Sequence, residues 1–133
     1  NYFAKKGYSV YSIDLIGFGN SAQPGLKEIE KLDNGIKILI KFTDWIKNKM
    51  QKSKDDVSAA CNDYLKVLGY VAVAHSWIKV LEVSFENYDT NKEFYEDKIN
   101  TAKFYFERVL PRIESHYITA VSGSDYIMKH KFN

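Results

Sequence analysis

The sequence has few of the residues that hold a chain together through covalent or metal bonds. Its 133 residues include one cysteine, Cys61, which excludes an internal disulfide and a cysteine-based zinc cluster. The three histidines, His75, His116 and His130, lie too far apart in sequence to share a helix face at a spacing of three or four residues. We therefore predict that the chain holds no metal ion.

An excess of charge of one sign and long apolar runs are also missing. Nineteen basic and 17 acidic residues leave a net charge of +2, which gives no reason to expect a nucleic-acid partner. No uncharged run exceeds twelve residues, the length of residues 67–78. A membrane-spanning helix needs about 20 apolar residues, and no signal-peptide pattern opens the sequence. We expect no membrane span and a cytoplasmic location.

Proline and glycine are scarce and unevenly placed. Two prolines and seven glycines permit long ordered segments, and ten tyrosines with eight phenylalanines supply material for a core. Most of the glycines precede residue 36: Gly7, Gly17, Gly19, Gly25 and Gly35. We therefore divide the chain near residue 36, into a part of residues 1–36 and a part of residues 37–133.

The first part contains a short β-like segment. Residues 8–13 are rich in aromatic and β-branched side chains, which predicts a strand, and the glycines and Pro24 that follow predict a loop. Residues 17–22 match the loose dinucleotide fingerprint, but Pro24 and Gly25 interrupt the helix that must follow it. Since no second strand is evident downstream, the segment either pairs with another chain or belongs to a larger sheet.

The second part has helical periodicity from Ile36 onward. Two capping-box patterns, Ser53-x-x-Asp56 and Thr90-x-x-Glu93, predict helices over residues 55–86 and 91–121. The four-residue link between them makes these helices antiparallel neighbours, and Pro111 is expected to kink the second one. The predicted fold is mainly α: an antiparallel helix pair or small bundle with shorter helices and the N-terminal β-like segment.

Apolar stripes predict which residues of the two long helices face the core. On the first helix they are Val57, Cys61, Tyr64, Leu68, Val71, His75, Ile78 and Phe85. On the second they are Tyr95, Ile99, Ala102, Phe106, Val109, Ile113 and Tyr117. Cys61 and His75 are accordingly expected to be core or half-buried residues, and no role is assigned to His116 or His130.

Residues 1–35 resemble a segment of the α/β-hydrolase fold. Residues 7–24 read GYSVYSIDLIGFGNSAQP, and G-Y-x-V…D-L-x-G-x-G-x-S-x-x-P recurs in that family. The segment is scaffold in those enzymes and carries none of the catalytic triad. The stretch YVAVAHSWI at residues 70–78 is similar to the G-H-S-W-G elbow, with Ala74 and Ile78 in place of the glycines. A truncated hydrolase with Ser76 as nucleophile is therefore the alternative to Ser76 and His75 lying on a long helix.

Residues 38–133 resemble the C-terminal helical domain of acyl-CoA dehydrogenase-like flavoproteins. The resemblance rests on NDYLKVLGYVAVA at residues 62–74, on FYEDKINTAKFYFERVLP at residues 94–111, and on the final GSDYIM at residues 123–128. It implies a family reaction in which FAD accepts hydride from an acyl-CoA while a carboxylate removes the α-proton. The catalytic base and the flavin contacts belong to a core outside this sequence. The resemblance therefore assigns no catalytic or cofactor-binding residue here.

The two resemblances belong to unrelated folds, so the chain is either a true fusion or a chimeric, incomplete reading frame. The function we predict is a non-catalytic accessory helical module, with FAD bound in the separate core. Its expected partner is that catalytic core or a second subunit, contacted through a helical face. Because both the β-like segment and the helical face would expose apolar surface, we also expect self-association.

Overall fold

The computed structural model describes residues 25–131. The helices are α3 (Leu26–Met50), α4 (Lys54–Glu86), α5 (Lys92–Phe104), α6 (Arg112–Val121) and α7 (Asp125–Met128). A 3-10 turn, η1 (Tyr88–Thr90), precedes α5, and a π-helical turn, η2 (Tyr105–Val109), follows it. No strand occurs within residues 25–131. The strand predicted at residues 8–13 lies outside the described residues.

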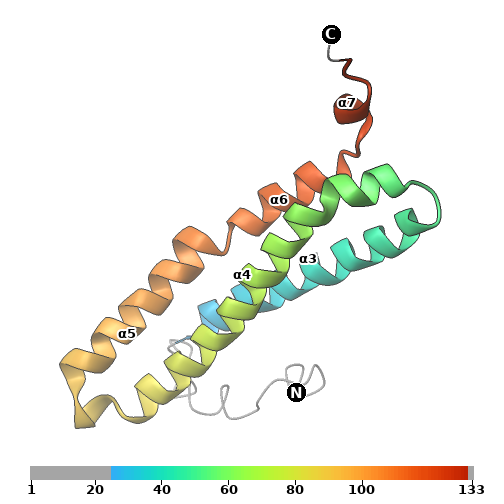
Figure 1. Cartoon of the computed structure of the whole chain (residues 1–133). Helices are drawn as coiled ribbons and strands as arrows, with labels where there is room; N and C mark the ends of the chain where they lie inside the picture. Colours follow the sequence, from blue (N-terminus) through green and yellow to red (C-terminus); the bar gives the residue numbers. More distant parts are fainter. Residues whose placement is uncertain (1–24, 132–133) are drawn as a thin grey trace.

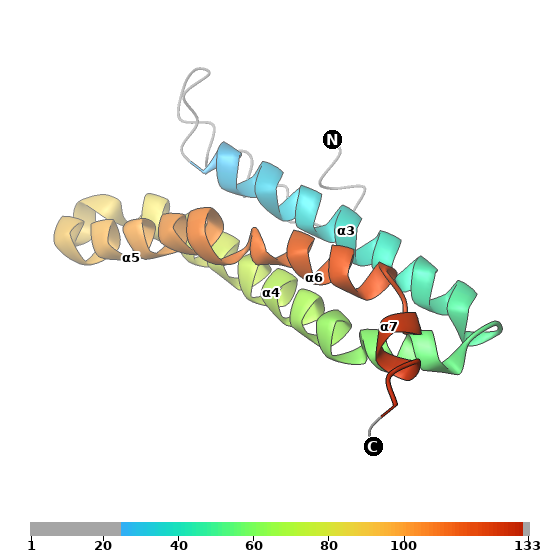
Figure 2. The same cartoon turned by 90° about the horizontal axis from the view of Figure 1, so that it is seen from above.

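The helices form an elongated bundle with α4 at its centre (Figures 1 and 2). Helices α3 and α4 are antiparallel and are joined by a tight turn at residues 51–53. The chain then turns back through η1, so that α5 and α6 follow α4 in the opposite direction. Helix α6 also contacts α3, whereas α5 extends along α4 beyond the beginning of α3. The predicted antiparallel pair is confirmed, and α3 packs against it as a third helix.

The two predicted caps have different outcomes. Ser53 caps α4 as expected, because its hydroxyl accepts a hydrogen bond from the Asp56 amide at 3.2 Å. The cap predicted at Thr90 is instead made by Asn91, whose side-chain oxygen accepts from the Phe94 amide at 3.3 Å. Thr90 donates to the Asn87 carbonyl at 2.6 Å, and its hydroxyl therefore helps to close the preceding turn.

Helical structure begins at Leu26 rather than near Ile36, which corrects the position expected from periodicity. Gly25, with φ 85°, precedes the helix, and Ile29 and Leu32 within its first turns are 3% and 1% exposed. Gly35, the last of the glycines that precede residue 36, is a helix residue. It lies inside α3, where a Cβ atom would come within 3.3 Å of Ile113 Cδ1. The glycine therefore permits α3 and α6 to approach closely.

The expected kink at Pro111 is present, and a π-helical turn directly precedes it. The helix predicted over residues 91–121 is divided into α5, η2 and α6. Pro111 has no N–H to donate to the preceding turn. In η2 the Leu110 amide donates to the Tyr105 carbonyl, five residues back, at 2.9 Å. A π-turn of this kind accommodates one extra residue and is frequent at functional sites.

The core surrounds Phe42, which is fully buried. The Phe42 ring makes edge-to-face contacts with Tyr64 and Tyr117, at centroid distances of 5.1 and 5.5 Å. These contacts join α3, α4 and α6. Other fully buried side chains are Leu32, Val67, Leu81, Ser84 and Phe106.

The predicted stripe of α4 is partly wrong. Cys61 and His75 are exposed, and Leu68 is 42% exposed. The core positions are instead taken by Ala60, Val67, Ala74 and Leu81, together with the correctly predicted Val71 and Ile78. Because α4 has apolar residues around much of its circumference, periodicity alone does not determine which side of it turns inward. The stripe of the second helix is better placed, since Ile99, Ala102, Phe106 and Ile113 are all buried.

Candidate functional site

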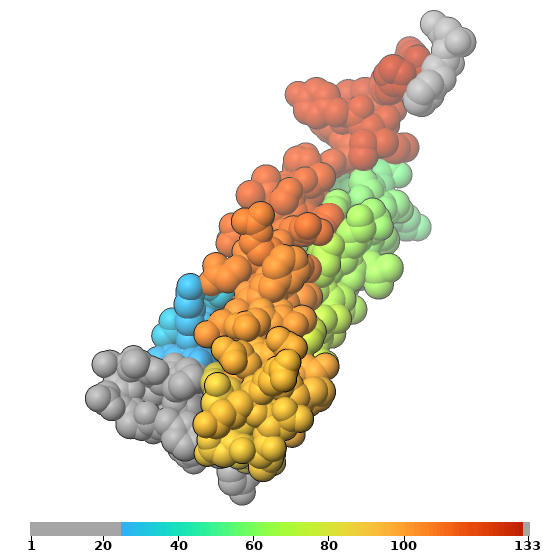
Figure 3. Space-filling view, turned by 90° about the vertical axis from the view of Figure 1, so that its left-hand side faces the viewer, coloured from blue at the N-terminus to red at the C-terminus, as the bar shows by residue number. Residues whose placement is uncertain are grey.

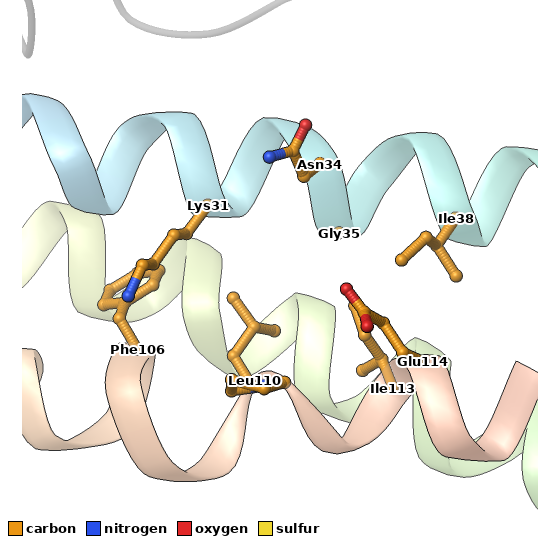
Figure 4. Close-up of a pocket in the computed structure, with 9 residues that line it drawn as sticks. Lys31, Asn34, Gly35, Ile38, Phe106, Leu110, Ile113 and Glu114 are labelled. Atoms are coloured by element: carbon orange, nitrogen blue, oxygen red, sulfur yellow. The ribbon is translucent and has the colours of Figure 1, made fainter.

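A groove lies between α3 and the segment that joins η2 to α6 (Figure 4). Its volume is about 170 Å³. Lys31, Asn34, Gly35 and Ile38 line it from α3, and Phe106, Leu110, Pro111, Ile113 and Glu114 line it from the other side. Two local features create the space: Gly35 contributes no side chain, and the π-turn with Pro111 bends the opposite helix. We call this site the α3–α6 groove.

One end of the α3–α6 groove carries a small ion-pair network. The Glu107 carboxylate accepts hydrogen bonds from Lys27 and Lys31, at 2.7 and 2.6 Å. These bonds lower the pKa of Glu107 to about 2, and the same contact raises the pKa of Lys27. Glu107 is therefore ionised at neutral pH, and the network fixes α3 beside η2.

The other end of the groove has unpaired polar groups. In Figure 4 the Glu114 side chain extends from α6 into the gap toward α3. Among residues 25–131, neither Glu114 nor Asn34 has a side-chain hydrogen bond or ion pair. The groove thus combines an apolar floor with a carboxylate and an amide at its rim. Sites for drug-sized ligands have volumes of about 300–1,000 Å³, so this groove suits a single large side chain better than a nucleotide cofactor.

A second feature is an apolar surface of α4 that faces away from the other helices. It consists of Leu65, Leu68, Gly69, Ala72, Val73 and Ser76, which are all exposed, and we call it the α4 face. Leu65 is 66% exposed and Val73 is 45% exposed, and a Cβ atom on Gly69 would meet no atom within 4 Å. An apolar helix surface with small residues at its centre permits the close approach of another helix.

The same composition bears on the expectation that the chain has no membrane span. Helix α4 is long enough to cross a membrane, and its most apolar window of 18 residues has a mean hydropathy of 1.2. Only 33% of that window is buried in the bundle. The central helix of a soluble bundle passes the same test of length and composition, so this observation is weak support for a span.

The C-terminal segment is anchored at its base and exposed at its tip. Asp56 Oδ1 accepts hydrogen bonds from the Ser124 amide and hydroxyl, at 2.9 and 2.7 Å, and Oδ2 accepts from Lys49 Nζ at 2.8 Å. The bonds from Lys49 and then from Ser124 lower the pKa of Asp56 to about 2. Gly123 has φ 86°, a conformation that favours glycine. The chain beyond this anchor projects from the end of the bundle (Figure 3).

The sequence profile of a family described as acetyl-CoA dehydrogenase C-terminal like matches residues 18–131. The chain belongs to this family. No curated protein and no solved structure matches the sequence. The match supports the resemblance of residues 38–133 to an acyl-CoA dehydrogenase C-terminal domain, and it begins upstream of residue 36. The α/β-hydrolase resemblance of residues 1–35 stays a prediction.

In this acetyl-CoA dehydrogenase C-terminal-like chain, Ser76 lies in the middle of α4. Its hydroxyl donates to the Ala72 carbonyl at 3.3 Å, as serine often does within a helix. A nucleophile elbow requires a sharp turn from a strand into a helix, and the backbone around Ser76 is continuous helix. The geometry proposed for the hydrolase alternative is therefore not present at Ser76.

The other residues considered from sequence are not brought together. His75 is on α4, His116 is on α6 and His130 follows α7. Among residues 25–131 no group of three or more His, Cys, Asp or Glu side chains could hold a metal ion. The Cys61 thiol donates to the Val57 carbonyl within α4.

One polar pair was not predicted from sequence. His116 Nδ1 lies 2.7 Å from Asp63 Oδ1, which connects α6 with α4. Beside it, the Tyr105 hydroxyl donates to the Tyr70 carbonyl at 2.6 Å, and burial raises the pKa of Tyr105 to about 12. Because the partners are 53 and 35 residues apart, no local sequence pattern could have indicated either contact. Both contacts fix helix positions, and none of their four residues lines the α3–α6 groove.

Proposed function

We propose that this chain is a non-catalytic accessory helical module of an acyl-CoA dehydrogenase-like flavoenzyme. The observation that carries the proposal is the family match over residues 18–131, in a chain whose regular elements between residues 25 and 131 are all helical. The family description names a C-terminal-like part of a dehydrogenase, which is a part that accompanies a catalytic one. The reaction itself, the FAD-dependent dehydrogenation of an acyl-CoA, would belong to that other part.

The size and charge of the α3–α6 groove support the part of the proposal that puts FAD outside this chain. The α3–α6 groove, at about 170 Å³, is smaller than the sites that hold small cofactors. Its carboxylate, Glu114, would repel the phosphates of FAD or of an acyl-CoA. For this reason we assign no step of the reaction to a residue of this chain and place the flavin in the catalytic core.

The α4 face is the surface through which we expect the module to contact the catalytic core. It carries several exposed large apolar side chains on one helix, among them Leu65, Leu68 and Val73, and such groups of apolar residues mark interaction sites. Burial of apolar area contributes about 25 cal/mol per Å². The small residues Gly69, Ala72 and Ser76 would let a helix of the core approach closely.

Binding to a separately produced catalytic core of this family tests the proposal. We expect the chain alone to purify colourless and the complex to carry FAD through the core. Leu65→Asp on the α4 face should weaken binding at least tenfold. The matched control is Ile118→Asp on α6, because Ile118 is also 66% exposed but lies on a different helix. A yellow stoichiometric complex of the chain alone with FAD would overturn the proposal, and so would failure to bind any such core.

The alternative, a truncated hydrolase with Ser76 as nucleophile, predicts ester hydrolysis that Ser76→Ala abolishes. The position of Ser76 within α4 does not favour it. We expect the chain to hydrolyse a p-nitrophenyl ester no faster than buffer does, and Ser76→Ala to leave that background rate unchanged.

A further inference from the structure

The C-terminal segment, residues 125–131, presents three consecutive large apolar residues to solvent. Tyr126, Ile127 and Met128 are 95%, 62% and 58% exposed. Single exposed apolar residues are normal on protein surfaces, but a cluster of them marks an interaction site or an aggregation hazard. We call residues 125–131 the C-terminal arm. It stands beyond the end of the bundle in Figures 1 and 3.

The base of the C-terminal arm is fixed, in contrast to its tip. Ser124 is 5% exposed and is held by both its amide and its hydroxyl on Asp56. Asp56 is in turn held by Lys49. These bonds set the direction in which the arm leaves the bundle, so its apolar residues are displayed in a defined place.

The α3–α6 groove has the complementary chemistry. Its apolar floor has room for one large side chain, and Glu114 at its rim has no partner among residues 25–131. The C-terminal arm supplies large apolar side chains followed by the basic residue Lys131. Apolar burial and charge complementarity would therefore act in the same contact.

The arm does not reach the groove of its own chain. The groove lies at the beginning of α6, around residues 110–114, whereas the arm leaves beyond the opposite end of α6 and points outward (Figures 1 and 2). Helix α6 has ten residues, which separates its two ends by about 15 Å at 1.5 Å per residue. An arm that occupies this groove must consequently come from another copy of the chain.

We propose that two copies of this chain form a dimer by exchanging C-terminal arms, each arm lying in the α3–α6 groove of the other copy. The exchange is reciprocal, so one two-fold axis satisfies both grooves and closes the assembly at two subunits. The contact uses neither the α4 face nor the catalytic core. It is therefore independent of the proposed function.

Sedimentation equilibrium tests the proposal on the full chain. We expect a dimer whose dissociation constant rises at least tenfold in Ile127→Asp and, to a smaller extent, in Glu114→Lys. Ile118→Asp and Leu65→Asp, at similarly exposed apolar positions, should leave the dimer unchanged. Circular dichroism should show all four variants to be folded, since each changes an exposed side chain.

A cross-linking experiment locates the contact. In a Cys61→Ser background, Asn34→Cys and Ile127→Cys proteins are mixed and oxidised, and the expected product is a covalent heterodimer with a 34–127 disulfide. Asn34→Cys mixed with Ile118→Cys is the matched control and should give none. A monomer at about 1 mM, the weak end of the affinity scale, would overturn the proposal. A dimer that Leu65→Asp dissociates and Ile127→Asp does not would overturn it as well. Neither of these results would measure binding of the catalytic core.

Discussion

The two ends of the bundle are built differently. Where α3, α4 and α6 lie together, each helix has two neighbours, and aromatic rings from all three meet at Phe42. At the other end, the described residues form a two-helix hairpin of α5 and the last turns of α4, because α3 begins only at Leu26 (Figure 2). Phe94 in this hairpin is 49% exposed. A two-helix layer buries one side of each helix, whereas a third helix encloses a core.

We therefore expect most of the stabilisation to lie in the three-helix part. The inter-helix polar contacts follow the same distribution. Asp63 with His116 and Tyr105 with Tyr70 join α4 to the returning segment, and Glu107 joins that segment to α3. We expect the hairpin to be the less stable end.

The largest effect is expected when a buried side chain is truncated to alanine in the three-helix part and in the hairpin. Phe42→Ala should lower the free energy of unfolding by about 3–5 kcal/mol, because it leaves a cavity at the junction of three helices. Ile99→Ala, in the hairpin, should lower the free energy of unfolding by about 2 kcal/mol, the low end of the range for buried Ile→Ala substitutions. The loss is small because the thinner layer of side chains can close around the cavity. Urea denaturation measures both. An equal or larger loss for Ile99 would show the two ends to be equally well packed.

Hydrogen exchange tests the same comparison without a substitution. Local opening is favoured where few apolar contacts hold an element. We expect amides of α5 to exchange at least tenfold faster than those in the middle of α4 and in α6. Uniform protection along α5 and α6 would contradict a weaker hairpin.

Helix ends and periodicity were predictable from sequence where a local signal existed. Ser53 and Asp56 form a capping pattern, because the hydrogen bond from the Asp56 amide to the Ser53 hydroxyl joins residues only three positions apart. Helix α4 begins there. Pro111 likewise predicted a kink in the second helix. The rotation of α4 could not be predicted, because Leu65 and Leu68 on its exposed side are as apolar as Val67 and Val71 on its buried side.

The candidate site was beyond prediction for a different reason. The α3–α6 groove depends on Gly35 approaching Ile113, which is 78 positions away in sequence, and on a π-turn that no pattern before Pro111 specifies. From sequence, Gly35 served only to divide the chain near residue 36, and it received no structural role. Only the tertiary structure shows that its missing side chain makes room for a neighbouring helix.

An acid titration should sharpen the comparison at the anchored end of the three-helix part. Folding lowers the pKa of Asp56 from 3.8 to about 2. The ionised carboxylate therefore stabilises the folded state fully above about pH 4, and this stabilisation is lost as the pH falls toward 2. Asp56→Asn should lower stability at pH 7 and reduce the loss of stability between pH 4 and 2. Glu107, also lowered to about 2, acts in the same window, but its exposed pairs with Lys27 and Lys31 are screened by salt. Melting temperatures at low and high salt separate the two carboxylates.

The smallest effect is expected from a comparison of Gly→Ala substitutions at two positions of the three-helix part. Gly69→Ala on α4 should raise the free energy of unfolding by about 0.5–1 kcal/mol, because alanine favours the helix and its Cβ would meet no atom within 4 Å. Gly35→Ala receives the same gain in helix propensity, but its Cβ would lie 3.3 Å from Ile113 Cδ1 and 3.5 Å from Val71 Cγ2. The crowding should cancel part of that gain, so Gly35→Ala should be the less stable variant. Urea denaturation of the matched pair gives the difference directly. If Gly35→Ala proved the more stable, α3 and α6 would have room to separate, and the close approach that shapes the groove would not be a constraint of the fold.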